Sequence, residues 1–147
     1  MTIPPGRTTS HRHPAALLLR VLVAAGLLVD AAVHLHLAPG YQEASPDGVG
    51  LGTLFRLQAV AALATAIYVL TRGTRRAYLA GFLVAGAAVA AVLTSRYVDL
   101  PAIGPLPPMY EPVWYVEKAA SAIAEVVTAA LALTGLIRSP AGKPRNG

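Results

Sequence analysis

The segment 14–38, PAALLLRVLVAAGLLVDAAVHLHLA, decides the fold of this chain. It is apolar apart from Arg20, Asp30, His34 and His36. A helix needs about 20 mostly apolar residues to cross the hydrocarbon core of a bilayer. The apolar core of a signal peptide is shorter, about 7–15 residues, so we expect this segment to be retained. It therefore predicts a membrane-spanning helix.

Three more segments have the length and the apolar character of a membrane span. With the first, the predicted spans are residues 14–38, 51–71, 77–98 and 113–137. Only 13% of the 147 residues are charged, against about 25% in an ordinary soluble domain. The sequence thus predicts an all-α fold, an integral membrane four-helix bundle over residues 14–138, with tails at 1–13 and 139–147.

Basic residues gather on one side of the predicted bundle. Nine of the twelve occur at the start of the first span, between the second and third, or after the fourth: Arg7, Arg12, Arg20, Arg72, Arg75, Arg76, Arg138, Lys143 and Arg145. Loops rich in Lys and Arg stay in the cytoplasm. The N- and C-termini are therefore expected to be cytoplasmic, in a multi-pass protein of the cell membrane.

Composition also excludes several function classes. The chain has no cysteine, which excludes disulfides, thiolate metal sites and cysteine nucleophiles. The net charge of +5 is explained by the basic side of the bundle, so nucleic acid is not an expected partner. No motif of a serine hydrolase, a zinc protease or a nucleotide-binding loop occurs, and the chain is not expected to be an enzyme.

The outer links and the third span have distinctive compositions. Residues 39–50 are predicted to form a turn-rich loop, and residues 99–112 contain five prolines that forbid a regular helix. That second loop is either a lid over the outer mouth of the bundle or a plain connector. The third span is rich in Gly and Ala, from Gly81 to Ala91, which favours close helix packing in lipid.

Polar side chains of the fourth span share one face. At 100° per residue, its strongly polar side chains fall within an arc of about 100°. They are Trp114, Glu117, Lys118, Ser121, Glu125 and Thr128. The opposite face carries Ile123, Val126 and Val127. This segregation predicts that the polar face points into the bundle.

The first and second spans supply matching groups. Asp30 and His34 are four residues apart, so they share a helix face, whereas His36 points nearly opposite to His34. Arg56 and Gln58 enter the second span at similar depth. We expect a polar cluster in the outer half of the bundle: Asp30, His34, Arg56, Gln58, Trp114, Glu117, Lys118, Ser121 and Glu125.

Several roles for this cluster stay open. The charges could neutralise one another and serve helix packing only. A metal site of His34, Asp30, Glu117 and Glu125 would suit zinc, iron or manganese. A small amphiphile such as a quinone would fit a polar pocket with nearby aromatic side chains. Proton or ion movement through Glu125 is a fourth role.

Three sequence motifs carry a resemblance. They are Asp30-x3-His34-Leu-His-Leu, Gly52-x-Leu54-Phe55-x-Leu57-Gln58, and Pro107-Pro108-Met109-Tyr110-Glu111-Pro112-x-Trp114. Together they resemble small four-helix membrane proteins of actinobacteria. That group has no assigned activity, so the resemblance implies a fold alone. In size and topology the chain is also similar to DoxX-like four-helix membrane proteins, some of which are associated with redox partners.

Two function classes follow from the sequence. One is a membrane protein whose outward-facing polar cluster binds a small ligand or a divalent metal ion. The other is a non-catalytic accessory subunit of a membrane complex, in which the buried charges hold the helices together. The expected partners are the lipid bilayer and either another membrane protein or further copies of the chain.

Overall fold

The computed structural model describes residues 14–43, 49–104 and 106–140. Four helices make up most of this part: α1 (Pro14–Glu43), α2 (Leu51–Arg72), α3 (Arg75–Tyr97) and α4 (Val116–Arg138). All four are long and apolar enough to cross a membrane. The described residues form no strand, only two isolated bridges between residues 100 and 109. The predicted all-α bundle of four apolar helices is confirmed.

Two helix ends differ from the predicted ones. The first helix continues through Pro39 to Glu43, so the predicted loop at 39–50 begins later. A proline inside a helix removes one backbone hydrogen bond, and here the helix continues for one more turn. At the other outer loop, α4 begins at Val116, because the residue before it, Tyr115, has an extended backbone.

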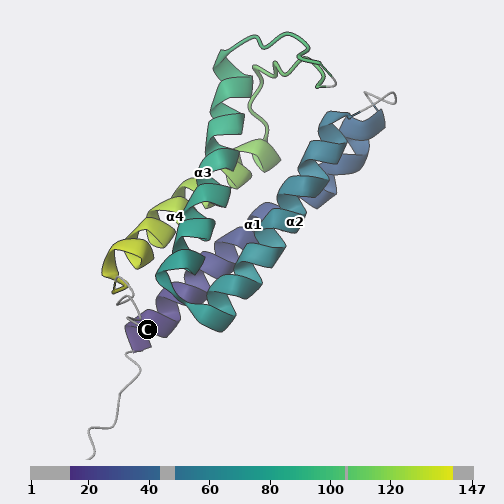
Figure 1. The fold of residues 1–147 in the computed structure, drawn as a ribbon. Helices are drawn as coiled ribbons and strands as arrows, with labels where there is room; N and C mark the ends of the chain where they lie inside the picture. Colours follow the sequence, from purple (N-terminus) through teal and green to yellow (C-terminus); the bar gives the residue numbers. More distant parts are fainter. Residues whose placement is uncertain (1–13, 44–48, 105, 141–147) are drawn as a thin grey trace, which may run out of the picture.

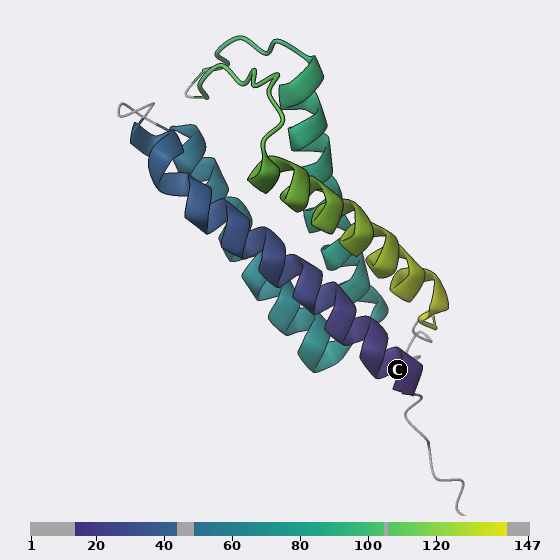
Figure 2. The ribbon, with the colours of Figure 1, turned by 180° about the vertical axis from the view of Figure 1, so that it is seen from behind.

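The helices pack as two antiparallel pairs (Figures 1 and 2). One pair is α1 with α2 and the other is α3 with α4. The pairs lie close together at the end where α1 begins and α4 ends, and they diverge toward the end that carries the 98–115 loop. The bundle is therefore closed at one end and open at the other.

The closed end contains the tight turn and most of the described arginines. Gly73 ends α2 in the left-handed conformation, with φ of 52°, and Thr74 caps α3 by accepting a hydrogen bond from the Ala77 amide. A side chain at Gly73 would also collide with the Arg20 guanidinium. Glycine is thus favoured here for its backbone freedom, whereas the Arg20 side chain is flexible and could move aside.

Small residues set how closely the helices approach in the closed half. The ring of Tyr78 on α3 lies directly over Gly135 of α4, where an added Cβ would overlap it. Gly81 lies against Val23, Val69 and Ala132. The predicted packing role of the third span holds at Gly81. Further along α3, Ala87 and Ala91 are exposed, so their small size leaves open space in the outer half.

Large apolar side chains cover the outside of the bundle. Ile123, Val126 and Val127 of α4 are each more than half exposed, as the polar segregation of the fourth span predicts. Large apolar residues are also exposed on the other three helices. In water such a surface would be an aggregation hazard, whereas in a bilayer it is the surface that contacts lipid.

The 98–115 loop folds back on itself. Antiparallel bridges join Leu100 with Met109 and Ile103 with Leu106. The Glu111 amide then donates to the Ser95 carbonyl at 2.8 Å, which fixes the return of the loop at the end of α3. This loop arches over the open end of the bundle (Figure 1).

Candidate functional site

A cavity of about 600 Å³ lies between the two helix pairs at the open end. All four helices and the 98–115 loop contribute to its walls. Its apolar lining residues are Val33, Leu37, Leu51, Leu54, Phe55, Ala87, Ala88, Ala91, Val92, Pro108 and Met109. Its polar lining residues are His34, Tyr41, Gln58, Ser95, Tyr110, Glu111, Tyr115, Lys118 and Ser121. The loop therefore forms part of the cavity wall, as the lid prediction requires.

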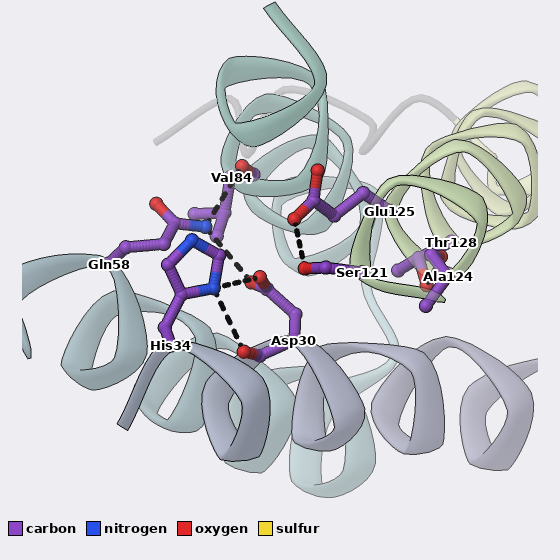
Figure 3. Close-up of polar contacts among 8 residues, drawn as sticks. All are labelled: Asp30, His34, Gln58, Val84, Ser121, Ala124, Glu125 and Thr128. Atoms are coloured by element: carbon purple, nitrogen blue, oxygen red, sulfur yellow. Dashed lines mark hydrogen bonds and ion pairs between the residues drawn. The ribbon is translucent and has the colours of Figure 1, made fainter. Parts of the chain in front are cut away.

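The deepest polar group of the site is Asp30, His34 and Glu125, which we call the acid–histidine triad (Figure 3). The Nδ1 atom of His34 lies 2.7 Å from Asp30 Oδ1 and 2.9 Å from the Asp30 carbonyl oxygen. Each member offers a ligand atom, and these atoms lie within 4.8 Å of one another. Asp30 is 2% exposed and Glu125 is fully buried. The triad thus joins α1 to α4 in the interior of the bundle.

Neighbouring polar groups occupy one oxygen of each carboxylate. The Gln58 amide donates to Asp30 Oδ2 at 2.9 Å, and the Ser121 hydroxyl donates to Glu125 Oε1 at 2.7 Å. The other Glu125 oxygen, Oε2, is buried and forms no hydrogen bond within the part of the chain that the structure describes. Asp30 Oδ1 has the His34 ion pair and no further hydrogen bond there.

The polar face of α4 explains how its residues reach the site. Lys118, Ser121, Glu125 and Thr128 are all buried, and they recur at intervals of three or four residues. This spacing keeps them on one face of a helix. His34 and Ser121 line the cavity, whereas Asp30 and Glu125 are not among its lining residues. The cavity therefore reaches the triad through His34 and Ser121.

A second polar group closes the outer part of the cavity. We call Tyr41, Glu111, Tyr115 and Lys118 the outer latch. The Tyr41 hydroxyl donates to Glu111 Oε2 at 2.5 Å and lies 2.7 Å from the Tyr115 hydroxyl. Lys118 Nζ donates to the Glu111 carbonyl at 2.7 Å and lies 3.6 Å from Oε2 of the same residue.

The protonation of Tyr115 fits this arrangement. Burial raises the pKa of its hydroxyl above the ordinary value of 10.0, and the nearby Glu111 and Glu117 carboxylates act in the same direction. Since the Tyr41 proton goes to Glu111, the Tyr115 hydroxyl is the donor to Tyr41. The latch thus connects the end of α1 with the loop and with the start of α4.

The structure brings six of the nine predicted cluster residues together in two places. Asp30, His34, Gln58, Ser121 and Glu125 meet at the base of the cavity, and Lys118 joins the outer latch. Arg56 is exposed and donates to Gln42 at 3.4 Å. Glu117 is exposed on α4, and Trp114 is 42% exposed, with its ring 5.8 Å from Lys118 Nζ.

Sequence reasoning did not place Tyr41 or Glu111 in the site. Tyr41 lies beyond Pro39, where the predicted helix had ended, so its position on the cavity side of α1 could not be foreseen. Phe55 was also missed, although its ring contacts both His34 and Tyr41, with centroids 5.1 and 4.7 Å away. His36, as predicted, is exposed on the opposite face of α1 from buried His34.

In comparisons with protein families, curated proteins and solved structures, nothing matches this chain. The resemblance drawn from the three motifs therefore stays a prediction.

The outer latch gives the first testable prediction. Tyr41→Phe removes the donor to Glu111 and the acceptor of Tyr115, each hydrogen bond contributing about 1 kcal/mol. Amide hydrogen exchange in residues 99–112 should become about fivefold faster or more, since each lost bond stabilises the closed loop. Tyr68→Phe, at the closed end, is the control and should leave this exchange unchanged. Equal exchange in the two variants would contradict the latch.

Proposed function

We propose that this chain is a multi-pass membrane protein that binds a small amphiphilic molecule of quinone type in its cavity. The observation that supports the proposal is the cavity itself, about 600 Å³ in volume. It has apolar walls, with polar groups both at its base and at its outer end. Ligand sites in proteins are mostly clefts of about 300–1,000 Å³ with apolar walls and a few placed polar groups. The cavity belongs to this class.

The two polar levels suit a ligand with a polar ring and an apolar tail. His34 and Gln58 lie at the base, and Tyr41 lies two helical turns nearer the loop, which corresponds to about 10 Å along α1. The carbonyl oxygens of a quinone accept hydrogen bonds. Lys118 lines the cavity and carries three N–H donors, and Phe55 supplies an aromatic wall between His34 and Tyr41.

Access from the bilayer is supported by the exposure of α3. Ala87 and Ala91 line the cavity, and both are exposed. The cavity therefore extends to the surface of the bundle along this helix. An amphiphile dissolved in the lipid can enter there without crossing water.

Charge supports an orientation in which the cavity faces outward. Arg72, Arg75, Arg76 and Arg138 lie at the closed end of the bundle, and membrane proteins keep such residues in the cytoplasm. The loop and the outer latch are then on the outer side of the cell membrane.

Single cysteines test this orientation, because the chain has none of its own. Ala102→Cys lies in the loop and Thr74→Cys lies at the closed end, and both positions are exposed. A maleimide that does not cross membranes should label Ala102→Cys in intact cells and Thr74→Cys only after lysis. The reverse labelling pattern would mean that the protein has the opposite orientation, with the cavity on the cytoplasmic side.

The chain offers its own reporter for ligand binding. Trp114 is the single tryptophan, and it lies beside Lys118 at the outer end of the cavity. Quenching of its fluorescence by decyl-benzoquinone should saturate in the purified protein. Ala91→Phe fills part of the cavity and should weaken binding about tenfold, or ~1.4 kcal/mol.

The matched control is Ala90→Phe. Ala90 is exposed on the same helix and is not among the cavity residues, so this substitution should leave the affinity unchanged. Quenching that does not saturate, or equal weakening in both variants, would contradict the proposed site.

A structural role is the second candidate, and one observation favours it. The Gln58–Asp30 hydrogen bond joins α2 to α1, and the triad joins α1 to α4. These contacts would hold the bundle together in an accessory subunit without any ligand. In that case the wild-type protein would show no saturable quenching, whereas Gln58→Leu would still lower its melting temperature.

A further inference from the structure

We infer that Asp30, His34 and Glu125 bind a divalent transition-metal ion at the base of the cavity. This site goes beyond the proposed amphiphile site, because two of its three residues, Asp30 and Glu125, lie behind the cavity wall and the site does not depend on what fills the cavity. It also differs from the four-residue site that the sequence predicts, since Glu117 is exposed and takes no part.

The ligand atoms are already gathered. Those of Asp30, His34 and Glu125 lie within 4.8 Å of one another. Ligands bound to zinc at 2.0–2.2 Å in tetrahedral geometry are about 3.4 Å apart. Binding an ion therefore requires the three side chains to rotate from their present positions.

The second observation is the buried oxygen of Glu125. Its residue is fully buried, and Oε2 has no hydrogen-bond partner among the described residues. Buried polar atoms are almost always satisfied, so this oxygen calls for a partner other than the hydrogen-bond donors of the described residues. Since Glu125, Asp30 and His34 each offer a ligand atom to one common group, a cation is a partner that all three residues can share.

The charge balance points the same way. Two carboxylates in an apolar interior are costly unless they are neutralised. Lys118, the buried lysine of α4, contacts Glu111 instead, and it lies two turns from Glu125, about 10 Å along the helix. With His34 neutral, one divalent ion balances Asp30 and Glu125 completely.

The surrounding hydrogen bonds match those of a metal site. Ligating carboxylates are usually held by hydrogen bonds to their other oxygen. Gln58 holds the second oxygen of Asp30, and Ser121 holds the second oxygen of Glu125. Glu125 thus keeps Oε2 for the ion, whereas an ion bound at Asp30 Oδ1 replaces the 2.7 Å contact of that oxygen with His34 Nδ1.

The ligand chemistry narrows the choice of metal. One imidazole and two carboxylates suit zinc, iron(II) or manganese(II), whereas calcium and magnesium prefer oxygen alone. Three protein ligands leave a coordination position open. His34 and Ser121 reach the cavity surface, so a molecule in the cavity has a path to that position.

The test is metal analysis of the full-length protein, purified in mild detergent without chelator after growth with added zinc, iron and manganese. We expect about one bound ion per chain by elemental mass spectrometry. Glu125→Gln and His34→Gln should each lower retention about tenfold or more. Glu117→Gln, an equal change at an exposed position of the same helix, should retain the wild-type content.

A second measurement distinguishes the loss of a metal ligand from misfolding of the variant. After removal of metal with chelator, Co²⁺ should produce visible d–d absorption in the wild-type protein and in Glu117→Gln. It should also raise their melting temperatures by binding to the folded state. Neither effect should occur in His34→Gln.

Two outcomes would overturn the inference. One is a wild-type metal content no higher than that of Glu125→Gln. The other is an equal loss of metal in Glu117→Gln and Glu125→Gln, which would indicate non-specific binding. Decyl-benzoquinone quenching in chelated protein separates this inference from the proposed function, since the cavity can bind the quinone whether or not the ion is present.

Discussion

The meeting of two buried carboxylates, Asp30 of α1 and Glu125 of α4, is the constraint on which the rest of this structure depends. An ionised carboxylate inside an apolar bundle costs several kcal/mol unless something compensates it. His34, Gln58 and Ser121 are placed to do part of this. What they leave unsatisfied is one oxygen of Glu125, and the account of a bound ion starts from that atom.

The fold gives this group its position and its access. At the closed end, Gly135 lets α4 approach the Tyr78 ring of α3 within one pair, and Gly81 packs against Val23 of α1 and Val69 of α2. At the open end the same kind of residue, at Ala87 and Ala91, leaves space beside the triad. Small residues of this bundle thus have two uses, close packing in one half and cavity space in the other.

Much of this arrangement follows from sequence patterns alone. The four helices follow from the length of the apolar segments, and the inward face of α4 follows from the spacing of Lys118, Ser121 and Glu125. The spacing of polar residues along α4 does not show that Glu117, at the edge of the same polar arc, is exposed. Nor could it find the Tyr41–Glu111 contact, which joins residues 70 positions apart and depends on a helix that continues past a proline.

X-ray absorption at the metal edge tests the central claim most directly, because it reports the atoms around the ion. The account predicts a first shell of nitrogen and oxygen only, with the outer-shell scattering of one imidazole, which His34→Gln removes and Glu117→Gln keeps. A first shell without imidazole scattering, or a spectrum that His34→Gln leaves unchanged, would contradict it. The buried group of Asp30, His34 and Glu125 would then serve only to hold the helices together.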